Sequence, residues 1–99
     1  MNTIESIDLI IKNPAVRKGS PCLVGTTLRV TDIVIAHLFH KRSPDELASD
    51  YQISLAHIYA ALAYYYQNKA MLDVDIRQQI LSARQAKEDV IGGQPSLLS

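Results

Sequence analysis

The sequence SPDELASDYQISLAHIYAALAYYYQN, residues 43–68, carries the strongest local signals in the chain and predicts two helices joined by a short turn. Ser43, Pro44 and Glu46 fit a capping box with proline at the first helical position, a combination that is specific to a helix start. We expect this helix to be short and to end near Asp50.

The second helix begins after Ser54, a good N-cap, and Asn68 closes it. Its apolar residues recur at spacings of three and four, as on one buried face of a helix. The predicted inward residues are Leu55, Ile58, Leu62 and Tyr65, and the predicted outward residues are His57, Tyr59, Ala60, Ala61, Tyr64 and Gln67. The layout is that of a helix-turn-helix, although three-helix packing serves many other proteins.

One helix precedes this pair and another follows it. We expect the first at residues 32–41, with Thr31 as its N-cap and with Lys41 and Arg42 at the end that favours cations. Its apolar stripe is Ile33, Val34, Leu38 and Phe39. We expect the last helix at about residues 73–89, followed by a mobile tail. Its weaker stripe is Val74, Ile76, Ile80, Leu81 and Ala83.

Three short strands are predicted at residues 7–11, 22–24 and 26–30, where β-branched and apolar residues gather between turn signals. Gly25 makes a tight turn or a bulge between the second and the third. Strands this short make a poor independent sheet, so they pair with another chain or lie across the helices. The predicted fold class is therefore mainly α, with a short N-terminal β arm and an extra C-terminal helix.

Length and composition indicate one globular domain, because the chain has 99 residues with an ordinary share of hydrophobic and charged side chains. Within it we separate residues 1–68, the β arm and helix-turn-helix, from residues 69–99, the C-terminal helix and mobile tail. The sequence has no apolar run of membrane-spanning length, no signal-peptide pattern at its start, and Cys22 as its single cysteine. We expect a cytoplasmic protein that does not enter the membrane.

The net charge is zero but unevenly distributed. Residues 1–42 carry six basic and three acidic residues, a charge of +3, whereas residues 43–99 carry four basic and seven acidic residues, a charge of −3. This asymmetry could place a basic face on an anionic partner or orient two subunits. A solvated surface without such a role is the alternative.

The sequence shows no catalytic or metal-binding pattern. His37, His40 and His57 are the only histidines, and no paired cysteine or His-Glu motif completes a site around them. Cys22 is better explained as a small buried residue than as a nucleophile, because no base lies near it in the sequence. We therefore expect neither an enzyme nor a cofactor.

The second helix of the predicted pair, which follows Ser54, would be the recognition helix of a helix-turn-helix. It carries no arginine or lysine, the residues that contact phosphates and read guanine. DNA affinity would come from the basic N-terminal half, and a dimer would double the contacts. The candidate DNA-binding residues are Arg17, Lys18, Arg29, Lys41, Arg42, His57 and Gln67. For His57 and Gln67 the alternative is that they only face water.

Aromatic and apolar residues provide candidates for protein contacts. The run Tyr64-Tyr65-Tyr66 points in three directions on a helix, so one ring can join the core while two lie on the surface or in an interface. A cluster at the rim of the core is the alternative. Leu97 and Leu98 could become ordered on a partner, or belong to a tail without one. The candidate partner-binding residues are thus Tyr64, Tyr66, Leu97 and Leu98.

The sequence NPAVRKGSPCLVGTTLRVTDIVIAHLFHKRSPDELASDYQISLAHIYAALAYY resembles the domain-of-unknown-function family 433, DUF433. That family has Asn-Pro, Gly-Lys-Pro, Gly-Thr-Arg-Ile-Pro-Val, Ser-Pro-Glu-Glu, Asp-Tyr and Ala-Leu-Tyr-Tyr at similar spacings. The matching residues are Asn13-Pro14, Gly19, Pro21, Gly25-Thr26, Val30, Ser43-Pro44, Glu46, Asp50-Tyr51, Ile58 and Ala61-Leu62. The resemblance covers roughly residues 7–68, and its combined spacing is specific although no single piece is.

The resemblance implies a helix-turn-helix of homeodomain-like topology behind a small β element. It also implies an antitoxin of a type II toxin–antitoxin pair, similar to VapB-type antitoxins, beside a PIN-like ribonuclease toxin. The segment from Leu72 to Ser99 would dock on the toxin, while a homodimer formed through the β arm would repress its promoter. The alternative is a non-enzymatic interaction or dimerisation module that keeps this shape without binding DNA, which the neutral recognition helix and zero net charge favour.

The sequence departs from the family pattern at one arginine. The usual Gly-Thr-Arg-Ile-Pro-Val becomes Gly-Thr-Thr-Leu-Arg-Val at residues 25–30, so the arginine moves two positions along, to residue 29. Residues two apart on a strand share a face, so Arg29 could reach a similar partner, either a carboxylate such as Asp32 or Asp50 or a phosphate. The missing proline also restores a backbone N–H for sheet pairing.

Overall fold

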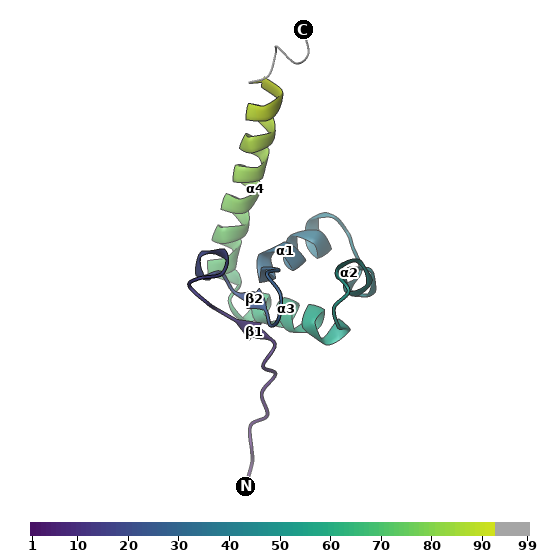
Figure 1. Ribbon diagram of the computed structural model, residues 1–99. Helices are drawn as coiled ribbons and strands as arrows, with labels where there is room; N and C mark the ends of the chain where they lie inside the picture. The colour runs from purple at the N-terminus through teal and green to yellow at the C-terminus, as the bar shows by residue number, and fades with distance from the viewer. Residues whose placement is uncertain (93–99) are drawn as a thin grey trace. The chain divides into compact units, whose positions relative to one another are not determined.

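The computed structural model describes residues 1–92, with side chains described to Asp89, and shows a mainly helical chain with a small two-stranded sheet (Figure 1). The α-helices of this part are α1, Val30–Val34; α2, Pro44–Tyr51; α3, Leu55–Gln67; and α4, Lys69–Gly92. The other elements are the strands β1, Ile10–Ile11, and β2, Cys22–Leu23, the 3-10 turn η1, Arg17–Gly19, and the π-helical turn η2, Ile35–Phe39. The predicted mainly α class with a small β element is confirmed.

The helix pair predicted at residues 43–68 is present. α2 begins at a capping box in which the Glu46 N–H donates to Ser43 Oγ at 3.1 Å and the Ser43 N–H donates to Glu46 Oε1 at 2.9 Å. It ends at the left-handed residue Gln52, whose φ of 55° turns the chain. Ser54 then caps α3 by accepting the backbone N–H of His57 at 3.2 Å.

The buried face of α3 differs from the predicted one at two positions. Ile58, Leu62 and Tyr65 are buried as expected. Ala61 is also buried, because it lies three residues after Ile58 and four before Tyr65 on the same side of the helix, so its assignment to the outer face is wrong. Leu55 is 40% exposed and not part of the core, because it lies in the first turn, at the end of the helix.

The helix before this pair starts and ends earlier than the sequence predicts. Arg29 and not Thr31 caps α1, because the Asp32 carboxylate accepts the Arg29 backbone N–H at 2.9 Å. Thr31 is buried inside the first turn. The chain then widens into η2, and Lys41, predicted as the last helical residue, lies outside the helix with φ 60°. Phe39, from the predicted apolar stripe, is 57% exposed.

β1 and β2 pair antiparallel within the chain, with Ile10 opposite Leu23 and Ile11 opposite Cys22. The ladder is therefore only two residues long, shorter than the predicted strands at 7–11 and 22–24. β2 is buried, whereas β1 lies at the edge of the sheet.

The third strand, predicted at residues 26–30, is not formed. Gly25 has φ 79°, and the Thr26 hydroxyl donates to the backbone carbonyl three residues earlier at 2.9 Å, so the chain reverses at once. A single bridge between Cys22 and Arg29 remains before α1 begins. The turn and the early start of α1 leave no length for a strand.

The core of the N-terminal part gathers side chains from β2, α1, α2 and α3. Its fully buried large side chains include Leu23, Val30, Ile33, Val34, Leu47 and Ile58. α3 packs against both α1 and α2 and also contacts β1 (Figure 1). It is the central helix of this part, and its outward side positions the candidate site.

α4 begins at Lys69, earlier than predicted, because a single non-helical residue separates it from α3. Leu72 and Ile76 of this helix are buried. Val74 and Leu81, which belong to the predicted stripe, are instead 48% and 53% exposed.

Contacts within the chain define two compact units, one of residues 1–69 and one that starts at Ala70. Among residues 1–92, no helix combines the length and the apolar character that a bilayer crossing requires.

Candidate functional site

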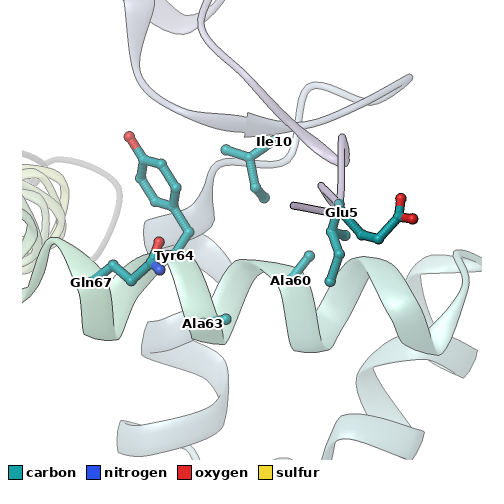
Figure 2. A pocket seen from close by; sticks show the side chains of 7 residues that line it. Glu5, Ile10, Ala60, Ala63, Tyr64 and Gln67 are labelled. Carbon is teal, nitrogen blue, oxygen red and sulfur yellow. The ribbon is translucent and has the colours of Figure 1, made fainter. Parts of the chain in front are cut away.

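The outward side of α3 forms one wall of a groove. Ala60, Ala63, Tyr64 and Gln67 recur at the spacing of one helical face, opposite the buried residues of α3 (Figure 2). β1 and the segment before it form the other wall. The residues that line the groove are Glu5, Ile7, Ile10, Ala60, Ala63, Tyr64 and Gln67, and its volume is about 390 Å³.

Ala60 and Ala63 carry short side chains, which leaves open space along this side of α3. Ile10 points from β1 toward α3, while Tyr64 and Gln67 lie toward one end of the groove and Glu5 lies toward the other (Figure 2). The groove therefore offers apolar walls with a hydroxyl, an amide and a carboxylate group. None of its seven lining residues is a cation, so it does not attract phosphate.

A stripe of exposed side chains runs along α3 beside the groove and consists of Leu55, Tyr59 and Tyr66. We call it the aromatic stripe after its two tyrosines. These side chains are 40%, 55% and 60% exposed and lie within about 40° of one another around the helix axis. Of the three consecutive tyrosines, Tyr65 is buried, Tyr64 is half-buried in the groove, and Tyr66 lies in the stripe with its ring 5.1 Å from that of Tyr65. One ring in the core and two outside it matches the expected distribution.

Arg29 is held by Asp32 in a bidentate ion pair. Its Nη2 donates to Oδ1 at 2.9 Å and its Nε donates to Oδ2 at 3.2 Å, while the two side chains are 26% and 22% exposed. The partner that the sequence leaves open is thus the carboxylate of Asp32. The pair fixes the first turn of α1, because the same carboxylate accepts the Arg29 backbone N–H.

Arg42 bridges two acids of α2. Its Nη1 donates to Glu46 Oε2 at 2.9 Å, its Nη2 donates to the Asp50 carboxylate, and His37 Nδ1 donates to its carbonyl at 2.7 Å. The hydrogen bond and charge of Asp50, followed by the charge of Glu46, raise the pKa of Arg42. Hydrogen bonds from Ser43 and then the charge of Arg42 lower the pKa of Glu46. The guanidinium is therefore committed to carboxylates of its own chain.

Arg17, Lys18 and Lys41 are exposed and lie in turns. Arg17 and Lys18 belong to η1, between β1 and β2, and Lys41 precedes α2. Their φ angles are 49°, 57° and 60°, and they are three of the four non-glycine residues with positive φ among residues 1–92. Because this conformation costs an L-residue about 1–2 kcal/mol, the fold holds these cations at turns at some expense in stability.

The last two predicted DNA contacts lie on α3 but not together. His57 Nδ1 is 2.6 Å from Ser54 Oγ, so its imidazole belongs to the cap of the helix. Gln67 lies in the groove beside Tyr64. The groove thus brings together a predicted DNA contact and a predicted partner contact. Leu97 and Leu98 lie outside the described residues.

Sequence reasoning missed most of the groove. The helical pattern places Ala60 on the outer face and indicates no role for it or for Ala63, although small residues three apart beside Tyr64 are a local signal for open space. Glu5 and Ile7 give no such signal, because only the tertiary fold places the segment before β1 against α3.

Neither Cys22 nor a cluster of potential metal ligands adds a second site among the described residues. Cys22 Sγ donates to the Ser20 carbonyl at 3.4 Å, and burial raises the pKa of the thiol, which keeps it protonated at neutral pH. Within the part of the chain that the structure describes, histidine, cysteine and carboxylate side chains nowhere gather in threes as metal ligands would.

Comparison with protein families finds a match to the family described as "Protein of unknown function (DUF433)", over residues 10–65. The matched region starts at β1 and ends within α3, so it covers the sheet, α1, α2 and the alanine and tyrosine residues of the groove. Comparisons with curated proteins and with solved structures find no match. The family match confirms the resemblance in the motifs of the sequence.

Proposed function

Because the chain belongs to the DUF433 family, whose function is unknown, we propose that it is a cytoplasmic antitoxin of a type II toxin–antitoxin pair. In this proposal a homodimer represses its own promoter, and the chain also neutralises a PIN-like ribonuclease toxin. The observation that carries the proposal is the unit of α2 and α3, two capped helices joined by residues 52–54, with α1 packed against α3. In the proposal these three helices act as a homeodomain-like helix-turn-helix.

Phosphate contacts in this proposal come from the turns and not from α3. Arg17, Lys18 and Lys41 are exposed there, whereas Arg29 and Arg42 are already paired with carboxylates. Three cations give a monomer only a weak and salt-sensitive affinity for DNA. A dimer doubles these contacts, and for this reason the proposal includes a homodimer.

The exposed side of α4 supports the toxin-binding part of the proposal. Met71, Val74 and Leu81 are 49%, 48% and 53% exposed and recur at spacings of three and seven residues, which places them on one face. Amphipathic helices dock in apolar grooves through anchors at such spacings. This face of α4 would lie on the toxin.

The DNA-binding part is tested by fluorescence anisotropy of the chain on its own promoter DNA and on scrambled DNA, at two salt concentrations. We expect promoter-selective binding that weakens as salt increases. Lys18→Ala and Lys41→Ala should weaken it, and Lys87→Ala, which changes an exposed lysine of α4, is the matched control. Absence of binding at low salt, both for the chain alone and with the toxin present, would contradict this part.

The toxin-binding part is tested by co-expression with the product of the adjacent gene. We expect the two proteins to copurify and the chain to relieve toxicity. The double variant with Val74→Asp and Leu81→Asp should lose both effects, while Ala83→Asp, exposed on another side of α4, should keep them. Equal behaviour of these two variants would remove α4 from the toxin interface.

A second candidate function is a protein-interaction module without DNA binding. The observation that favours it is the neutral outward side of α3, where the groove and the aromatic stripe present apolar, aromatic and amide groups. Such surfaces are typical of protein interfaces. A chain that binds the toxin but no DNA at low salt would support this candidate over the repressor.

A further inference from the structure

The outer edge of β1 has no partner strand in the part of the chain that the structure describes. β1 is an edge strand, and β2 occupies its other side. The Leu9 carbonyl accepts the Val24 N–H at 2.8 Å, so Leu9 and Ile11 direct their backbone polar groups toward β2. The alternating residues, whose backbone polar groups face the outer edge, are Asp8, Ile10 and Lys12.

This edge also exposes apolar side chains. Ile7 is 75% exposed and Ile11 is 49% exposed. Unpaired N–H and C=O groups beside apolar side chains form a template for another strand, which natural proteins otherwise protect with charges, proline or a covering element. A strand added here would pair with the exposed backbone groups and cover Ile11 at once.

We propose that β1 pairs antiparallel with β1 of a second copy of this chain, about a two-fold axis that passes beside Ile10. In this register Asp8 of each copy lies opposite Lys12 of the other, and Leu9 lies opposite Ile11. Opposite charges and apolar pairs that face each other across antiparallel strands stabilise the pairing. The symmetry makes the Asp8–Lys12 and Leu9–Ile11 contacts occur twice, once on each side of the axis, as a closed dimer requires.

The charged residues favour this register over the neighbouring registers, in which the two-fold axis passes beside another residue of the strand. An axis beside Asp8 or Lys12 sets two like charges opposite each other, which is destabilising. An axis beside Leu9 or Ile11 sets a charged residue opposite Ile10. Only the axis beside Ile10 places Asp8 and Lys12 opposite residues of opposite charge. In the same register the hydrogen-bonded pairs are formed by Asp8, Ile10 and Lys12, whose backbone groups face the outer edge.

The side chains then divide between the two faces of a four-stranded sheet. Ile10 of each copy stays on the face toward its groove, as Figure 2 shows for one copy. Leu9 and Ile11 of both copies meet on the other face and form one apolar cluster. For its biological use this dimer rests on the proposed function, since it would hold two α3 helices in a fixed relation for two DNA half-sites.

Sedimentation equilibrium at low salt, without DNA, tests the dimer. Asp8→Lys or Lys12→Asp alone sets like charges opposite each other twice, and each should raise the dimer dissociation constant about tenfold. The exchange variant that carries both substitutions restores opposite charges and should return to within about threefold of the original value. Glu88→Lys makes the same charge change as Asp8→Lys at an exposed position of α4, outside the paired residues, and should have no effect.

Rescue by the exchange variant supports the proposed edge. A chain that stays monomeric at millimolar concentration overturns it, and so does a dimer that neither single variant weakens, which would point to another surface such as the aromatic stripe. Because the assay contains no DNA, its result is independent of the repressor function. A dimer with the expected charge dependence that never binds the promoter contradicts the proposed function and leaves this interface standing.

Discussion

Replacing Arg29 with alanine should destabilise the chain, because it removes both guanidinium hydrogen bonds to Asp32. Exposed ion pairs contribute about 0.2–1 kcal/mol, and hydrogen bonds to charged groups contribute about 1.5–3 kcal/mol. This pair lies between these cases, since its two side chains are 26% and 22% exposed. We therefore expect a loss of about 1–2 kcal/mol in the free energy of unfolding, which lowers Tm by roughly 5–15 °C for a domain of this size.

Two other variants serve as controls for the stability of Arg29→Ala. Arg17→Ala removes an arginine that is exposed in η1, so its effect should stay within about 0.5 kcal/mol. Arg29→Lys keeps the charge but not the planar fork that meets both carboxylate oxygens, so it should recover only part of the loss. Thermal and urea unfolding, followed by circular dichroism, measure all three variants under the same conditions.

A double-mutant cycle isolates the pair itself. Asp32→Ala removes the carboxylate and also its bond to the backbone N–H of residue 29, so it should cost more than Arg29→Ala. With both residues replaced, the loss should be smaller than the sum of the single losses by a coupling energy of about 1 kcal/mol. Equal stability of Arg29→Ala and Arg17→Ala, or strict additivity in the cycle, would refute the assignment of Arg29 to the start of α1.

Three further changes test other parts of the structure. Folding lowers the pKa of Glu46, so its contribution to the free energy of unfolding is complete above its ordinary pKa of 4.5 and is lost as the pH falls below that value. The stability of Glu46→Gln should therefore fall less steeply with decreasing pH than that of the original chain. Gln52→Gly should raise the free energy of unfolding in urea by up to about 1 kcal/mol, because glycine adopts φ 55° without strain, and a decrease would contradict this. Asp50→Asn should free part of Arg42 for phosphate, so the slope of log affinity against log salt should steepen by up to about one unit, whereas an unchanged slope would show that Arg42 does not reach the DNA.

The sequence was informative where the deciding interactions are local. Ser43 and Glu46 cap α2 across three residues, and Ser54 and Asn68 mark the two ends of α3. Each of these signals depends on hydrogen bonds that close within one helical turn, so the residue types alone are enough to place the helices. The family motifs add the order of these elements.

The same local rules fail at the start of α1. Thr31 followed by Asp32 is a good cap by composition, yet Asp32 reaches back to the N–H of Arg29 and the helix starts earlier. The choice between two caps two residues apart is made by burial of Thr31 and by the turn at Gly25, and neither is visible in a short window.

The groove could not be predicted because it depends on distant segments. Glu5 and Ile10 approach Ala60 and Tyr64 only after β1 has paired with β2 and the helices have packed. The partner of Arg42 could not be predicted either. Asp50 lies two turns along α2, and the sequence alone does not decide whether Arg42 binds this carboxylate or a phosphate.

The distribution of charge separates the shape of a DNA-binding unit from its chemistry. A phosphate at Arg29 or Arg42 would have to displace a carboxylate that already binds the guanidinium, so it gains little net attraction there. Arg17 and Lys18 are exposed, and they lie in the turn that connects β1 to β2. Pairing of two β1 edges would therefore bring two such turns, and four cations, into one assembly. DNA affinity and dimerisation would then depend on the same short segment, and a variant that weakens the β1 pairing should lose affinity for DNA even though no cation of η1 has changed.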